Sequence, residues 1–441
     1  MKKHKKLFII LGVVLSITIG LMFVMSSKKD DFYKENTETK IVKRGNTISM
    51  MLETEAGSGN YEMTTQSEWP TDGYTFNSTL SKCENGGELS WDDTNKKVYM
   101  SGNLSDKCYV YFDKKPTLLA DYVKSLYADT QGNNNIYYHD GSIKDSNGNV
   151  IDAGDNSYRY SGTNNDVNNF VCFDGSDCNN EKNLYRIVGV YENTKVKLLK
   201  YEYATTDEVG KDNNDGTFSK SDYPNYDGTL ETIPKFSWAA SASSTVAMLS
   251  NYRVIFTAPT PDCDDTNLNL SDGSLINDNL NKNYLNSLDD NIKSKIIQNK
   301  FYYWTRSPSM YPFYNAKRAY IVENDSDYKD TYYDEKIGIL NSNEYMFSFS
   351  KDFWLTNSYN IEGPNSWIFR GIPEYLSSQS QEGGGQMQTG YISNDGSIRA
   401  GYSCVESANS LSSVAIRPAF YVQDIKLLSG NGTKQNPYII E

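Results

Sequence analysis

The feature that most constrains this chain is an uninterrupted apolar segment near its N-terminus. Residues 7–25 contain no charged residue and no proline, and four lysines lie just before them. As a helix, these 19 residues would span about 28 Å, close to the hydrocarbon core of a bilayer. Because positive charges stay on the cytoplasmic side, the segment predicts a single-pass membrane anchor with the N-terminus inside and the rest of the chain outside.

The alternative is a cleaved secretory signal peptide. Val24 and Ser26 are small residues at the two positions that a signal peptidase recognises. The apolar run is longer than the usual signal core of roughly 7–15 residues, which favours retention as an anchor. Under either interpretation the residues after 27 are exported, and under the second the protein is secreted.

Charge and composition narrow the classes of partner. The net charge is −13, and residues 1–27 hold four lysines and no acid, which leaves −17 for the exported part. An acidic exported part argues against nucleic acid or an anionic membrane surface as a partner. It suits cation binding or neutral ligands such as glycans. The 35 tyrosines are typical of a β-rich protein, and a few are expected on a binding surface.

Cysteine usage agrees with export. The chain has six cysteines, an even number, which favours disulfides formed in an oxidising compartment. A zinc site is disfavoured because no two cysteines have CxxC spacing and histidines are scarce. Proximity in the sequence predicts two bonds and leaves one further pair: Cys83–Cys108, Cys172–Cys178, and then Cys263 with Cys404.

Four consecutive parts are expected along the chain. They are a cytoplasmic tail with the apolar segment (1–27), a polar stalk (28–45), a small β module (46–115) and a large α+β domain (116–441). In the β module, short alternating segments recur at roughly 8–12-residue spacing between glycine turns, which predicts an antiparallel, immunoglobulin-like β-sandwich. A spacer that holds the next domain off the surface is the favoured role for this module.

Local patterns predict several elements of the α+β domain. Thr117 is expected to cap a helix that extends to 127, and Glu192-Asn193 to form the turn of a hairpin over 183–203. The other expectations are a helix over 275–297, a capping box between Asn341 and Glu344, a hairpin turning at Asn147-Gly148, and a strand over 414–422 whose Pro418 implies an edge or irregular position.

An ordered set of motifs resembles a known family. The matching segments are 185–190, 197–200, 280–286, 336–340 with Glu344, a tryptophan such as Trp367, a glycine hairpin, and 414–420. The family is a domain of unknown function in secreted and surface proteins of Gram-positive gut bacteria, and it is similar to formylglycine-generating-enzyme and C-type-lectin-like folds. The resemblance implies an α+β scaffold whose long loops bind a ligand. The copper-dependent oxidase chemistry of formylglycine-generating enzymes requires two close cysteines, and Cys404 has no near neighbour, so that activity is not carried over.

Candidate site residues fall into two groups. Residues able to stack on or contact a sugar are Trp304, Arg306, Trp354, Trp367 and Tyr391, with core packing as the alternative for the aromatic ones. Calcium is the cofactor considered, with oxygen ligands from Asp262, Asp264 and Asp265, and solvated loop acids are the alternative.

Three further residues are interpreted as structural. His139, the only histidine after residue 27, has no nucleophile or metal partner at a diagnostic spacing and is expected to be a hydrogen-bonded core residue. Arg186 and Arg417 lie within apolar strands, and each is expected to pair with a buried acid or carbonyl.

These observations predict a membrane-anchored extracellular protein. The favoured function is a non-catalytic binding or adhesion module for a glycan or protein ligand, and no catalytic residue is assigned. The alternatives are an exported enzyme acting on glycans and a structural spacer or assembly component with no small ligand.

Overall fold

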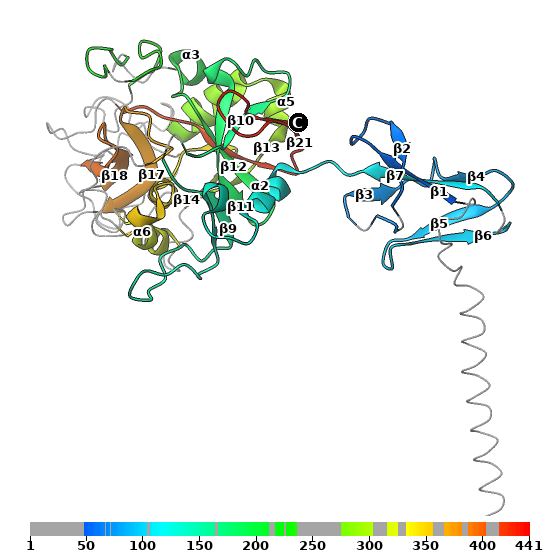
Figure 1. Ribbon diagram of the computed structural model, residues 1–441. Helices are drawn as coiled ribbons and strands as arrows, with labels where there is room; N and C mark the ends of the chain where they lie inside the picture. Colours follow the sequence, from blue (N-terminus) through cyan, green and yellow to red (C-terminus); the bar gives the residue numbers. More distant parts are fainter. Residues whose placement is uncertain are drawn as a thin grey trace, which may run out of the picture. The chain divides into compact units, whose positions relative to one another are not determined.

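The computed structural model describes residues 48–66, 68–70, 72–103, 106–163, 166–210, 217–224, 226–235, 275–302, 315–324, 332–355, 366–381, 387–402 and 414–441 (Figure 1). The chain divides into two compact units, with the boundary between Pro116 and Thr117. Strands predominate and the helices are few and short, which confirms the predicted α+β class. No helix within the described ranges is long and apolar enough to cross a membrane. The predicted anchor at 7–25 lies outside those ranges.

The first unit contains a five-stranded sheet and a separate hairpin. The sheet has the order β2-β1-β7-β3, and β4 also pairs with β7. β1 and β7 run parallel, which differs from the all-antiparallel arrangement expected, and residues 54–107 supply the long connection that parallel strands need. The bounds are β1 (Ile48–Glu53), β2 (Tyr61–Met63), β3 (Tyr74–Phe76), β4 (Lys82–Cys83), β5 (Glu88–Asp92), β6 (Lys97–Ser101) and β7 (Cys108–Lys114).

The core of this unit lies between the sheet and the β5–β6 hairpin. Met50, Val98, Val110 and Phe112 form its buried cluster. The predicted Cys83–Cys108 disulfide is confirmed and joins β4 to β7.

The second unit is built around a ten-stranded sheet with the order β13-β20-β12-β11-β10-β22-β21. β16 also pairs with β20, and β9 joins β8 to β11. The bounds are β8 (Ile136–His139), β9 (Ser157–Tyr160), β10 (Phe170–Phe173), β11 (Leu184–Tyr191), β12 (Lys195–Lys200), β13 (Ile296–Ile297), β16 (Ile337–Gly338), β20 (Ala419–Gln423), β21 (Leu427–Ser429) and β22 (Tyr438–Ile440).

Smaller elements surround that sheet. α2 packs on β11 and β12 (Figure 1). Two small sheets pair β14 (Asn299–Tyr302) with β15 (Tyr332–Glu335), and β18 (Met387–Ile392) with β17 (Glu374–Gln381) and β19 (Ile398–Tyr402). The helices are α2 (Leu119–Tyr127), α3 (Thr206–Val209), the π-helical η3 (Leu275–Tyr284), α4 (Leu285–Ser287), α5 (Asp290–Lys295), α6 (Ala316–Glu323) and α7 (Ser342–Phe347), with 3₁₀ turns η1 (Asn133–Asn135), η2 (Glu181–Asn183) and η5 (Lys351–Phe353).

Several local predictions are confirmed in this unit. β11 and β12 form the expected hairpin, and Glu192 and Asn193 both adopt positive φ at its turn, as the twist of a tight hairpin favours. Asn341 and Glu344 form the predicted capping box at the start of α7. The Cys172–Cys178 disulfide is also confirmed. Cys263 and Cys404 lie outside the described residues.

Other local predictions are wrong at their boundaries. Thr117 does not cap α2; the N-cap is Leu118, whose hydrocarbon side chain cannot form a capping bond, and the backbone here pairs with residues 425–427. The helix expected over 275–297 is broken into η3, α4 and α5 and ends in β13. Pro418 was expected at an edge or at an irregular position, and it lies in an irregular stretch just before β20. β20 itself has neighbours on both sides, so the edge alternative is wrong.

Candidate functional site

A cavity of about 570 Å³ opens beside the β11–β12 hairpin in the second unit. Strands β9, β11, β12, β14, β15, β17 and β20 contribute to its wall, together with helices α6 and α7. Its cationic lining residues are Arg159, Lys195, Lys197 and Lys300. Its carboxylates are Asp155, Glu192, Asp334 and Glu344. Positive and negative side chains therefore balance within the described lining.

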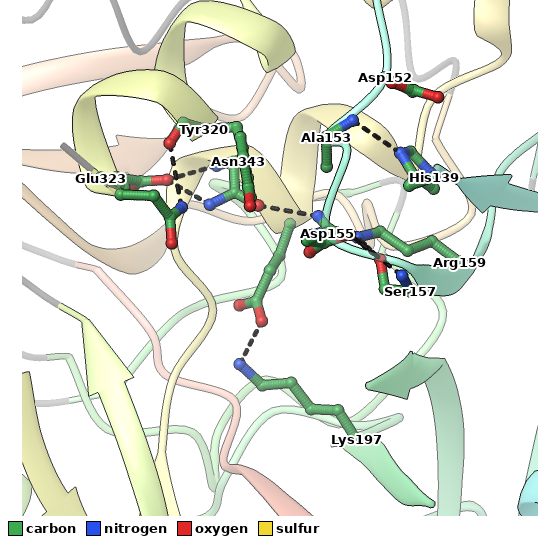
Figure 2. A network of polar contacts seen from close by, with 12 residues as sticks. His139, Asp152, Ala153, Asp155, Ser157, Arg159, Lys197, Tyr320, Glu323 and Asn343 are labelled. Carbon is green, nitrogen blue, oxygen red and sulfur yellow. Dashed lines mark hydrogen bonds and ion pairs between the residues drawn. The ribbon is translucent and has the colours of Figure 1, made fainter. Parts of the chain in front are cut away.

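Arg159 is the most heavily bonded cation of the cavity. It is 3% exposed and donates from Nε to Ser157 Oγ at 2.8 Å, from Nη1 to Asn343 Oδ1 at 2.8 Å and from Nη2 to Asp155 Oδ2 at 2.6 Å (Figure 2). Burial acts to raise the pKa of Asp155, but the nearby Arg159 guanidinium outweighs it and holds that pKa below its usual value. This pair is therefore ionised and rigid at neutral pH.

Lys197 is the second buried cation in the lining of the cavity. It is 2% exposed on β12, and its ammonium extends toward α7, where it lies 2.5 Å from Glu344 Oε1 (Figure 2). The rings of Phe301 and Tyr421 lie 5.1 Å from the ammonium on other sides. Burial lowers the pKa of Lys197 although Glu344 opposes that shift. An ammonium has three N–H groups, and within the described part of the chain Glu344 is its one hydrogen-bond acceptor.

Glu344 is fixed by the start of α7. Its other carboxylate oxygen accepts a hydrogen bond from the backbone N–H of Asn341 at 3.1 Å, as the capping box requires. The same carboxylate thus closes the helix terminus and neutralises Lys197. This double role makes the ion pair part of the scaffold of the cavity.

Tyr191 lines the same cavity and has an unpartnered hydroxyl. Its ring lies 5.2 Å from the Arg159 guanidinium, and its Oη is buried with no hydrogen-bond partner among the described residues. Burial raises the pKa of this phenol, so the hydroxyl keeps its proton and can donate. An unsatisfied buried hydroxyl costs free energy, and a ligand atom that bonds it contributes a net of about 0.5–1.5 kcal/mol.

Glu323 supports the site from behind. It accepts hydrogen bonds from the backbone N–H groups of Ser342 and Asn343, from Asn343 Nδ2 and from Ser378 Oγ (Figure 2). Burial raises the pKa of Glu323 to about 7. The residue ties α6 to α7 and orients Asn343, which in turn holds Arg159, but Glu323 is not part of the cavity lining.

The three described aromatic candidates, Trp354, Trp367 and Tyr391, do not line this cavity. Trp354 and Trp367 are 0% and 1% exposed, and each indole N–H donates to a backbone oxygen, of Phe349 at 2.9 Å and of Tyr160 at 3.0 Å. Both tryptophans are therefore core residues with no ring face free for a sugar, which agrees with core packing, the alternative stated for them. Tyr391 is half-buried on β18 and does not line the cavity.

The remaining candidates lie outside the described residues. These are Trp304, Arg306, Asp262, Asp264 and Asp265. Over the described ranges, no group of three or more acidic, histidine or cysteine side chains is arranged to hold a metal ion.

The three residues interpreted as structural have that character. His139 is buried, and its Nδ1 accepts a hydrogen bond from the Ala153 N–H at 3.0 Å. Arg417 forms an ion pair with Glu374 at 2.6 Å. Arg186 donates to the carbonyl of Val167 at 3.1 Å. All three predictions are confirmed.

The cavity residues were missed in the sequence because their partners are remote. Lys197 and Glu344 are 147 positions apart, and Arg159 and Asn343 are 184 apart. One signal was present in the sequence. Lys197 lies between the apolar residues Val196 and Leu198 in a predicted strand, and a lysine that is buried needs a partner for its charge.

Comparisons with models of protein families, with curated proteins and with solved structures found no match for this chain.

Proposed function

We propose that this protein is anchored in the cell membrane by residues 7–25 and binds an extracellular ligand in the cavity of its second unit. The two disulfides support the location, because such bonds persist in oxidising compartments outside the cytoplasm. The orientation is the one the N-terminal lysines predict, with the N-terminus inside and both units outside. If the N-terminal segment is cleaved, the same units are secreted.

The finer architecture is part of this proposal. The first unit is an immunoglobulin-like β-sandwich, which is supported by a core enclosed between a sheet and a hairpin. The second unit is a C-type-lectin-like domain related to the Gram-positive surface family that its motifs resemble. The succession of hairpins and short helices around one sheet supports that relationship.

The observation that carries the binding function is the pair of polar groups left open on the cavity wall. Tyr191 Oη has no partner and the Lys197 ammonium has one, within the described residues. Both residues line the cavity together with Phe301, Tyr302 and Tyr421. A ligand oxygen placed there satisfies the hydroxyl and the ammonium, while the rings cover its apolar surface.

The balance of charge in the lining indicates the class of ligand. Among the described lining residues, cations and carboxylates are equal in number, so this lining carries no net charge that would attract an ion. A neutral, hydroxyl-rich molecule such as a glycan, or a zwitterionic peptide end, fits this lining better than a simple anion or cation. Extracellular glycans and proteins are the corresponding sources.

Binding is favoured over glycan hydrolysis by the state of the carboxylates. A glycosidase needs one protonated acid and one ionised partner across the scissile bond. Of the four carboxylates in the described lining, Asp155 is held ionised by Arg159, Glu344 is paired with Lys197 and Glu192 is paired with Lys195. Glu323 has the raised pKa that an acid catalyst needs, but it is not part of the lining.

The test is a calorimetric screen of the full chain in lipid nanodiscs against neutral oligosaccharides and short peptides. Tyr191→Phe removes the unpartnered hydroxyl, so it is expected to weaken binding roughly 3- to 10-fold without destabilising the free protein. Tyr160→Phe removes a core hydroxyl outside the lining and is expected to bind as the wild type does. Equal affinity of Tyr191→Phe and wild type for every ligand found would refute the assignment of this cavity.

A further inference from the structure

The first unit begins and ends on neighbouring strands. β1 is its first described strand and β7 its last, and the two pair in parallel over five positions, from Ile48 with Cys108 to Leu52 with Phe112 (Figure 1). The pair lies inside the sheet, because β2 pairs with the other edge of β1, and β3 and β4 pair with the other edge of β7. The chain therefore enters the unit at one end of this pair and leaves it at the opposite end.

This arrangement decides how the unit responds to a pulling force. A force on the two ends of the unit draws β1 toward its N-terminal end and β7 toward its C-terminal end. Since the strands are parallel, these directions are opposite and lie along the strands, so the pair is sheared and its hydrogen bonds share the force. In an antiparallel pair both pulled ends would lie at the same end, and the bonds would break one after another. Forced unfolding is governed by the rate of unfolding, so bonds that must break together raise the force that the unit withstands.

Apolar packing shields one face of the β1–β7 pair from water. Residues at alternate positions of paired strands share a face of the sheet. The three pairs on the core face are Ile48–Cys108, Met50–Val110 and Leu52–Phe112, and their side chains are buried or half-buried. A hydrogen bond is electrostatically stronger where water is excluded, so this packing protects the bonds that carry the force.

Glu53 adds a side-chain link at the C-terminal end of the pair. It is 3% exposed, and its carboxylate accepts hydrogen bonds from the backbone N–H of Lys114 at 2.9 Å and from that of Gly59 at 2.8 Å. Lys114 in turn donates from Nζ to the carbonyl of Thr54 at 3.0 Å. The ends of β1 and β7 are thus joined by bonds that sliding of the strands would also have to break.

The Cys83–Cys108 disulfide limits how far the unit lengthens once the pair has separated. It joins β4 to the first residue of β7 and closes a loop of 25 residue steps. A covalent bond holds that loop closed under tension, so the loop adds no length to the pulled chain.

We propose that the first unit is a force-resisting tether, in which the parallel β1–β7 pair keeps the unit folded while the chain is pulled between the membrane and a ligand fixed to another surface. The inference rests on the proposed function, because such a force arises only when one end is anchored and the second unit holds an immobilised ligand. It extends the expected role of a spacer. A spacer has only to keep a distance, whereas this unit keeps that distance under tension.

The experiment pulls the full chain in lipid nanodiscs by single-molecule force spectroscopy in two directions. Both proteins carry one covalent peptide tag after Glu441. In the first protein a second tag is inserted between Gly45 and Asn46, ahead of β1, so the pull shears the β1–β7 pair. In the second protein it is inserted between Gly57 and Ser58, in the exposed turn after β1, so both pulled points lie at the C-terminal end of the pair and peel it apart. Neither insertion changes a residue of the pair, and urea unfolding checks that the two proteins are equally stable.

The first unit is expected to unfold at a force about two- to fivefold higher in the sheared protein, the upper bound being the five register pairs that share the force. Reducing the disulfide should lengthen the released chain by roughly 90 Å, for the 25 steps of the closed loop at about 3.5 Å each, which identifies the event as unfolding of the first unit. Equal forces in the two directions, or a lower force in the sheared protein, overturn the proposal. No ligand is present, so the result is separate from the proposed function: a chain that binds nothing can still show the difference, and a chain that binds a ligand can fail to show it.

Discussion

Protonation of His139 is predicted to destabilise the second unit as the pH falls below about 6.5. The imidazole is 0% exposed, stacks on Trp354 at 5.1 Å and meets the edge of Phe347 at 4.8 Å. Its Nδ1 accepts the hydrogen bond from Ala153, so a second proton on the ring would break that bond. Burial lowers the pKa of His139 well below its usual value, and the nearby positive charge of Arg159 adds to the effect.

The magnitude follows from proton linkage. Below pH 6.5 the unfolded chain binds a proton at His139 and the folded chain does not, so stability is lost as the pH falls. The loss is up to about 1.4 kcal/mol per pH unit until the lowered pKa of the folded state is reached. His4 is the only other histidine of the chain.

Glu323 acts in the opposite direction over the same range. Its pKa of about 7 in the folded state lies above the ordinary value of 4.5, so the folded chain binds the extra proton. Its contribution is therefore complete at low pH and is lost as the pH rises through 7. The shift corresponds to about 3 kcal/mol across that interval. Between pH 5 and 6.5 the two residues are expected nearly to cancel in the wild type.

Two variants separate these effects. His139→Asn keeps an acceptor for the Ala153 N–H but does not titrate, so its free energy of unfolding should fall as the pH rises from 5 to 7. Glu323→Gln should show the reverse, a free energy of unfolding that rises over the same range. Urea unfolding at each pH measures both slopes, and subtracting the wild-type values removes contributions from groups that all three proteins share. Parallel slopes for the three proteins, or a His139 carbon resonance that titrates near pH 6.5, would refute the reasoning.

Two further perturbations test the packing of the second unit. Arg417→Met leaves the buried carboxylate of Glu374 without its counter-ion, so it is expected to lower the free energy of unfolding in urea by about 3–5 kcal/mol. Arg417→Met combined with Glu374→Gln should recover part of that loss. A cost below about 1 kcal/mol for the single variant contradicts the ion pair. Gly338→Ala would place its Cβ in overlap with the ring of Phe301, so it is expected to lower the free energy of unfolding by about 1–3 kcal/mol. Because Phe301 lines the cavity, the variant should also weaken ligand binding in calorimetry. Unchanged affinity in a folded Gly338→Ala protein contradicts the placement of that ring.

Features set by neighbouring residues were predictable from the sequence. The turn at Glu192-Asn193 and the capping box of Asn341 and Glu344 depend on a few consecutive side chains, and both formed as expected. Cysteines 25 and 6 positions apart paired for the same reason, since short loops close readily.

Features set by distant residues were not predictable. The parallel pairing of β1 with β7 joins segments about sixty residues apart, and no turn chemistry announces it. The cavity is assembled from side chains of several strands and two helices, so no single stretch of sequence shows it. The role of the tryptophans was also not predictable, because an indole suits both a core and a sugar-binding surface. Only the burial of Trp354 and Trp367 shows that both belong to the core.

The central claim, that the second unit binds a neutral or zwitterionic ligand between Lys197 and Tyr191, is tested most directly by one calorimetric comparison. The best ligand from the screen is titrated into the wild type, Tyr191→Phe and Tyr160→Phe under identical conditions. We expect Tyr191→Phe alone to bind more weakly, by roughly 3- to 10-fold, with the free energy of unfolding of the unliganded protein not reduced. Equal affinities for all three proteins, or weaker binding by Tyr160→Phe to the same degree, would contradict the claim.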